Sequence, residues 1–412
     1  MSDRPPVFVH AADLHLGAPL RALGKGINEE RRAQLVKLAD QTFDNLIDES
    51  IRLNAEFVVL SGDIYDGAER EAHAQIRFSV GLKRLVTAGI PVYIVHGNHD
   101  PLLNSVVNVV SLPEGVTVFG SDNVTSFRHT LRDGRTVLIA GVSYADKREE
   151  RRLASMFNGI KRDGDTAVVG VLHTNLGGVS SHGNYAPSSE SELSSAPVDY
   201  WALGHVHKRQ VKQIGPNRYW AYPGNLQGRD AGETGPKGAL VVPILTSGVG
   251  EPQFLPLDTF RFANLEIDCK QANDLSGIAS QISAMVLDLS DGRPMIVRVN
   301  LRGRSAAHSA VSATPNLEQE LEMLCGEALN HGYVERVKSF LLPELDLETL
   351  KAGDDLLGDL LRAMENLDPS VFDPAAVELN ASTVTAELIS ELRALMTADL
   401  LADLYTSGTE SA

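Results

Sequence analysis

The chain has 412 residues, of which 43% are hydrophobic and 22% are charged, and its formal net charge is −17. This length exceeds a single typical core, so we expect two or three domains. No apolar run is long enough to span a membrane, and the first residues contain no apolar signal region, so we predict a cytoplasmic protein with no membrane segment. The two cysteines, Cys269 and Cys325, lie in apolar surroundings, which predicts reduced core residues.

Negative charge is concentrated in the C-terminal part of the chain. Residues 1–260 contain 26 Lys and Arg against 29 Asp and Glu, whereas residues 261–412 contain 11 against 25. The acidic total therefore does not exclude a nucleic-acid substrate for the N-terminal part, where the charges nearly balance.

Strand-like and helical patterns alternate along residues 1–258, which predicts an α/β domain. The longest predicted helix of this domain runs from Glu29 to Asn54, where apolar residues recur at helical spacing. Short apolar runs rich in β-branched residues predict strands at Val7 to Ala12, Phe57 to Leu60, Val92 to Val95, Val168 to Leu172 and Tyr200 to Leu203.

A Gly- and Pro-containing stretch from Thr246 to Pro256 predicts the end of this domain. Residues 259–344 predict a small α+β capping domain. Its predicted elements are, in order, a strand at 262–269, a helix at 275–287, a strand at 295–301, a helix at 317–329 and a strand at 333–341. Residues 345–412 contain two Leu-rich helical stripes, which either cover the protein's own core or dock on a partner.

Each of the five predicted strands of the first domain is followed by polar residues that can bind metal ions. These residues form the motifs Asp13-Leu14-His15, Gly62-Asp63-Ile64-Tyr65-Asp66, Gly97-Asn98-His99-Asp100, a lone His173 and Gly204-His205-Val206-His207. Because an α/β sheet places its chemistry at the carboxyl ends of its strands, we expect these motifs to meet at one edge.

Seven side chains in these motifs are candidate metal ligands: Asp13, His15, Asp63, Asn98, His173, His205 and His207. Seven ligands are too many for one ion, but two ions that share Asp63 would each receive about four. Oxygen and imidazole donors without a thiolate suit Mn²⁺, Fe²⁺ or Zn²⁺. Taken alone, a histidine such as His173 is more often a packed core residue than a ligand. We expect His10 and His96 to be packed in the core or to lie just behind the ligands.

In their order along the chain, the motifs resemble the signature of the calcineurin-like metallophosphoesterase superfamily, D-x-H, G-D, G-N-H-D/E, H and G-H-x-H. The resemblance implies two packed mixed β-sheets flanked by helices, a layered sandwich. It implies one ion at Asp13, His15, Asp63 and His207, and a second at Asp63, Asn98, His173 and His205. A hydroxide bridging the ions would attack phosphorus, and His99 would protonate the leaving oxygen.

Three further stretches are similar to the SbcD-type DNA repair nucleases, and in particular to their YhaO-like branch. They are His10 to Gly17, Asp199 to Lys208, and Tyr222 to Arg229 followed by Glu233 and Gly235 to Gly238. This resemblance implies an exonuclease or endonuclease acting on DNA, with two divalent ions of which Mn²⁺ is the best candidate. It also implies an SbcC-type coiled-coil ATPase as partner and pairing as a homodimer.

One position departs from the family pattern. Many relatives carry a second active-site histidine three residues after the bridging aspartate, where this chain has Asp66. We expect Asp66 to accept a hydrogen bond from His99 and so to orient a catalytic imidazole, or else to form a turn beside Gly67. Two other functions remain open, a small-molecule phosphodiesterase or nucleotidase and a noncatalytic scaffold subunit of an ATPase complex.

Overall fold

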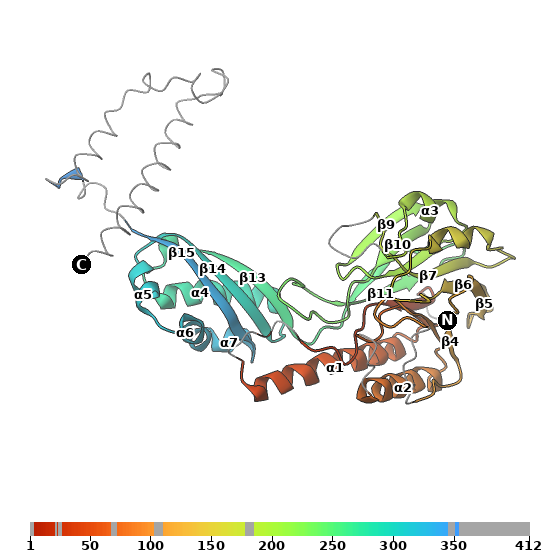
Figure 1. The fold of residues 1–412 in the computed structure, drawn as a ribbon, viewed down its shortest axis with the longest axis horizontal. Helices are drawn as coiled ribbons and strands as arrows, with labels where there is room; N and C mark the ends of the chain where they lie inside the picture. Colours follow the sequence, from red (N-terminus) through yellow and green to blue (C-terminus); the bar gives the residue numbers. More distant parts are fainter. Residues whose placement is uncertain are drawn as a thin grey trace, which may run out of the picture. The chain divides into compact units, whose positions relative to one another are not determined.

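The computed structural model describes residues 4–20, 23, 27–66, 72–102, 110–177, 185–344 and 351–353. These residues form two six-stranded sheets and one three-stranded sheet (Figure 1). The predicted helical tail at 345–412 lies outside the described residues apart from 351–353. The described residues fall into two compact units, one within residues 1–265, 283–298 and 325–336 and the other within 266–282, 299–324 and 337–353. The domain boundaries predicted at 258 and 344 stay predictions.

The first six-stranded sheet has the strand order β12-β11-β1-β2-β3-β4, and β1 to β4 run parallel. Parallel neighbours need crossover connections, and helices α1 and α2 provide two of them. Helix α1 begins after Asn28, whose side chain accepts a hydrogen bond from the backbone of Arg31. The bounds are β1 Val7–Ala11, α1 Glu29–Arg52, β2 Val58–Ser61, α2 Ala72–Thr87, β3 Val92–Val95, β4 Val116–Val118, β11 Gly238–Pro243 and β12 Gln253–Pro256.

The second six-stranded sheet has the order β5-β6-β7-β8-β10-β9, with a parallel centre from β6 to β10 and an antiparallel strand at each edge. The short 3-10 helix η1 and helix α3 connect its central strands. The bounds are β5 Thr125–Thr130, β6 Thr136–Val142, η1 Leu153–Gly159, β7 Ala167–His173, α3 Glu190–Ser195, β8 Tyr200–Gly204, β9 Gln210–Gly215 and β10 Arg218–Tyr222.

Three hydrophobic cores hold these layers together. Phe43 and Phe78 pack α1 and α2 on the outer face of the first sheet. Phe8 and Tyr200 belong to the core between the two sheets. Phe157 packs η1 against Trp201 on the outer face of the second sheet. The predicted layered sandwich, two mixed sheets flanked by helices, is confirmed.

The three-stranded sheet has the order β13-β14-β15, and helices α4 to α7 lie between these strands in chain order. The α+β elements predicted after residue 259 are therefore present. The predicted helix at 317–329 is divided into α6 and α7. Cys269 and Cys325 are both buried, as predicted. None of the described helices is long and apolar enough to cross a membrane. The bounds are β13 Arg261–Asp268, α4 Leu275–Ser290, β14 Met295–Ser305, α5 His308–Ala313, α6 Leu317–Leu324, α7 Gly326–Leu329 and β15 Tyr333–Pro343.

Candidate metal centre

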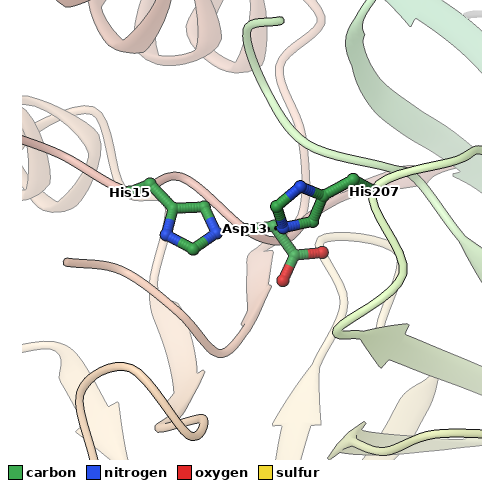
Figure 2. Close-up of side chains that lie close together, drawn as sticks. All are labelled: Asp13, His15 and His207. Atoms are coloured by element: carbon green, nitrogen blue, oxygen red, sulfur yellow. Dashed lines mark hydrogen bonds between the residues drawn. The ribbon is translucent and has the colours of Figure 1, made fainter. Parts of the chain in front are cut away.

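The carboxyl ends of β1, β2, β3, β7 and β8 meet at one edge of the sandwich, and the five polar motifs come together there. Asp13, His15 and His207 form one cluster, which we call the first half of the centre. The Nε2 atoms of His15 and His207 lie 3.1 Å apart, and Figure 2 shows both rings turned toward one another with the Asp13 carboxylate beside them.

Carboxylates lie behind both imidazoles of the first half. His207 directs Nδ1 at Glu233 Oε1, 2.5 Å away. His15 directs Nδ1 at Asp66 Oδ1, 3.5 Å away. A histidine ligand commonly donates its second ring N–H to a carboxylate, which sets the tautomer and leaves the other nitrogen for the metal.

Asp63, Asn98, His173 and His205 form the second half of the centre. The Oδ1 atom of Asn98 lies 3.0 Å from His173 Nε2 and 3.1 Å from His205 Nδ1. Asp63 Oδ2 lies 3.3 Å from the same His173 nitrogen. The backbone N–H of His205 donates to Asp13 Oδ1 at 3.0 Å, which joins the two halves.

A main-chain carbonyl lies directly behind His173, and the carboxylate oxygen Asp13 Oδ1 is farther from its Nδ1, at 4.0 Å. The Nδ1 atom of His173 faces the carbonyl oxygen of Ser61 at 2.9 Å. The motif glycines make this closeness possible, since a Cβ on Gly97 would overlap Asp63 Oδ1 and a Cβ on Gly204 would overlap the Ser61 carbonyl. The Ser61 hydroxyl in turn contacts His10 Nε2 at 3.1 Å.

Several residues of the centre have strained backbone conformations. Asp13, His15, Asp63 and His205 all have positive φ, at 51°, 46°, 51° and 106°. Residues other than glycine rarely adopt this region, and where they do so the surrounding structure must hold them. Such strain is typical of functional sites.

The donor distances fit two metal ions. Two ligands bound at about 2.1 Å to one ion, with about 90–110° between them, lie about 3.0–3.4 Å apart. The pair His15 and His207, at 3.1 Å, and the contacts of His173, at 3.0 and 3.3 Å, have this spacing.

The electrostatics of the buried groups also favour cations. Burial lowers the pKa of His173, but Asp63 and then Asp13 outweigh it and raise that pKa to about 9. Burial raises the pKa of the Asp63 carboxyl, but His173 and His15 hold it well below its usual value. The carboxylates that draw a proton into the buried His173 imidazole supply the negative potential that divalent ions require.

A third cluster, His15, Asp66 and His99, has a different character. The Arg229 guanidinium donates to Asp66 Oδ2 at 3.0 Å, and this positive charge disfavours a metal ion at Asp66. The other carboxylate oxygen lies 2.9 Å from His99 Nδ1, the contact expected from the sequence. The hydrogen bond to Asp66 raises the pKa of His99, whose side chain is 38% exposed.

The structure thus brings together all seven candidate ligands and both candidate catalytic residues. His10 and His96 are buried, as expected. Sequence reasoning did not assign Glu233 and Arg229 to the centre, although both lie in stretches that carried the resemblance. The sequence feature that could have indicated them is their spacing, because Arg229 and Glu233 lie four residues apart in one Gly-rich segment after β10.

A layered α/β sandwich with carboxylate, amide and imidazole groups gathered for two ions defines a dimetal phosphoesterase. The family model of the calcineurin-like phosphoesterase matches residues 6–209, and the middle domain of the metallophosphoesterase YhaO matches residues 262–339. The chain is 31% identical to metallophosphoesterase YhaO of Bacillus subtilis over 77% of this chain and 76% of that protein. The chain belongs to the calcineurin-like metallophosphoesterase family and carries a YhaO-like middle domain.

More distant relatives match about half of this chain. The DNA double-strand break repair protein Mre11 of Aeropyrum pernix is 29% identical over 54% of this chain and 53% of its own length. This match therefore spans about half of that protein. The crystal structure of a dimetal phosphatase from Danio rerio aligns with 62% of this chain and 98% of its own, at 13% identity and a TM-score of 0.37.

Proposed function

We propose that this protein is a divalent-metal-dependent phosphodiesterase that cleaves DNA. The observation that carries the proposal is the convergence of seven oxygen and imidazole donors, from five strand ends, at the spacing of metal ligands. The choice of DNA is supported by the similarity to proteins named for DNA double-strand break repair.

In this proposal the first ion is held by Asp13, His15, Asp63 and His207, and the second by Asp63, Asn98, His173 and His205. Each ion then receives four protein groups and retains positions for water and substrate. Oxygen and imidazole donors without a thiolate suit Mn²⁺, Fe²⁺ and Zn²⁺, and of these we propose Mn²⁺ as the working ion because the family resemblance favours it. When bound, the two ions would activate water and neutralise charge on the phosphoryl oxygens.

The residues beside the ions have separate tasks. His99 donates a proton to the departing oxygen, since its raised pKa favours the protonated imidazole and its side chain is exposed enough for a substrate to reach it. Asp66 holds Nδ1 of that ring, which directs Nε2 away from the carboxylate. Arg229 fixes Asp66 from the other side and offsets its negative charge.

We also propose the partners that the resemblance implies, an SbcC-type coiled-coil ATPase and a second copy of this chain. The segment expected to dock on the ATPase lies within residues 345–412, outside the described residues apart from 351–353. Co-purification of the full chain and a variant ending at residue 344 with the ATPase tests this part. Binding that is equal for both would contradict it.

The deciding experiment measures Mn²⁺-dependent cleavage of labelled linear DNA, with bis-p-nitrophenyl phosphate as a second substrate. We expect metal-dependent cleavage of both and loss of DNA cleavage in the His99→Ala variant. Hydrolysis of the ester without DNA cleavage, with and without the ATPase, would instead support a small-molecule phosphodiesterase. No hydrolysis of either would support a noncatalytic scaffold.

A further inference from the structure

The loop between β10 and β11 surrounds His207 on two sides. The backbone carbonyl of His207 accepts hydrogen bonds from the backbone N–H of Asn225, at 3.4 Å, and from Lys237 Nζ, at 3.2 Å. Gly224 approaches so closely that a Cβ there would lie 2.8 Å from the same carbonyl oxygen. The imidazole of His207 meets Glu233 from this loop.

The Glu233 carboxylate is fully engaged. Oε1 lies 2.5 Å from His207 Nδ1, while Oε2 accepts from Asn225 Nδ2 and from the backbone N–H of Arg229, both at 2.8 Å. Its side chain is only 17% exposed. Because two donors of the loop fix one oxygen, the other oxygen faces the imidazole in a set orientation.

We infer that Glu233 is a positioning residue that sets the tautomer of His207 for metal binding. An ionised carboxylate only accepts, so Nδ1 must carry the hydrogen, and Nε2 then keeps its lone pair. That nitrogen is the one facing His15 Nε2. The inference rests on the proposed function, in which His207 is a ligand of the first ion.

A purely structural role, in which Glu233 only closes its loop, predicts different behaviour. Glu233→Gln keeps an acceptor oxygen for Asn225 and the Arg229 backbone, but it presents an NH₂ group to His207. Nδ1 must then accept, which moves the ring hydrogen to Nε2, the metal-facing nitrogen. The substitution therefore preserves the loop and reverses the tautomer.

The test counts Mn²⁺ bound to the full, metal-stripped chain by electron paramagnetic resonance, which detects free Mn²⁺ and a coupled ion pair. We expect wild type to bind two ions and to show the signal of a coupled pair. Glu233→Gln should bind the first ion about 10–100-fold more weakly, lose the coupled signal and keep the second ion. Glu190→Gln, which removes the charge of an exposed glutamate paired with Lys212, should behave as wild type.

A double-mutant cycle separates positioning from loop closure. In a His207→Ala background, Glu233→Gln should change Mn²⁺ affinity no further, and the melting temperature of the metal-free protein should change equally little in Glu233→Gln and Glu190→Gln. Equal weakening of both ions, or a lowered metal-free melting temperature, would overturn the inference. If Glu233→Gln binds Mn²⁺ as tightly as wild type, the positioning role of Glu233 is wrong but the proposed function stands. If wild type binds no pair of ions, both the positioning role and the proposed function are wrong.

Discussion

The two halves of the centre are supported in different ways. In the first half, side-chain carboxylates lie behind the imidazoles, Glu233 behind His207 and Asp66 behind His15. In the second half, the Ser61 carbonyl lies behind His173, and glycines close the space around it. The histidines of the first half are therefore oriented by ionisable side chains from other loops, whereas His173 in the second half is oriented by a backbone carbonyl at the end of a strand.

Exposure does not follow the same division, because the side chains of Asp13 and His15 in the first half are 0% and 1% exposed. The His173 side chain is 0% exposed, whereas that of His207 is 26% exposed and that of His99 is 38%. On the proposed assignment, the buried groups of both halves anchor the ions, and His207 and His99 face the substrate. Substitutions should therefore separate loss of ions from loss of turnover.

The largest effect is expected for Asp63, which the assignment shares between both halves. Asp63→Asn should lower DNA cleavage at saturating Mn²⁺ by at least ~10⁴-fold, because both ions lose a charged ligand. Mn²⁺ binding measured by equilibrium dialysis should fall at both sites. The exposed Asp48→Asn serves as a control, and a variant at Asp63 that still bound two ions tightly would show that the halves do not share this residue.

His99→Ala should reduce turnover without loss of ions, by about 10²–10³-fold on DNA. The reduction should be smaller on bis-p-nitrophenyl phosphate, because nitrophenolate leaves without needing a proton. Comparing kcat on the two substrates, with His308→Ala as control, measures this difference. Equal reductions on both substrates would argue against a proton donor.

Arg229→Met should have a smaller effect, about tenfold on kcat, because it releases Asp66 but leaves the backbone N–H of residue 229 bonded to Glu233. Both ions should remain bound. Arg152→Met, which breaks an exposed pair with Glu192, provides the comparison. Loss of the first ion in Arg229→Met would mean that Arg229 supports the metal and not the orientation of His99.

A separate effect, on folding stability and with no change in turnover, concerns His10, whose Nε2 contacts the Ser61 hydroxyl beside the second half. Burial lowers the pKa of His10 to about 3, from 6.5 for an exposed histidine. Below pH 6.5 the unfolded chain binds a proton that the folded chain does not, so folding stability falls with pH toward about 3, by up to ~1.4 kcal/mol per unit. Above pH 6.5 His10 is neutral in both the folded and the unfolded chain, so its protonation costs the folded state no stability.

Urea unfolding of the metal-free protein at pH 7 and pH 5 tests this expectation. Wild type should lose more stability between the two pH values than His10→Gln, which has no imidazole to protonate. Parallel losses in the two proteins would show that His10 does not titrate as the burial implies.

The elements that could be predicted from the sequence are those with a clear period and a clear end. Helix α1 and strands β1, β2, β3, β7 and β8 carry long or strongly apolar patterns that stop at polar motifs, and they occur where predicted. The resemblance supplied the layered arrangement, since a local pattern does not say which strands pair. Edge strands such as β5 and β9 are largely exposed, so they carry little of the apolar signal that marks a strand.

The candidate site shows the same limit. Its ligand groups could be found because each follows a buried strand, so chain order predicts a shared edge. Glu233 and Arg229 come from a loop without secondary structure, and their partners His207 and Asp66 are 26 and 163 positions away in sequence. Only the folded chain shows that a carboxylate and a guanidinium from one loop reach different parts of the centre.

The most direct test of the central claim is anomalous X-ray diffraction at the manganese edge from crystals soaked in Mn²⁺. We expect two peaks roughly 3.5–4 Å apart, one between Asp13, His15 and His207 and the other between Asn98, His173 and His205, with Asp63 between them. A single peak, or peaks away from these residues, would contradict it.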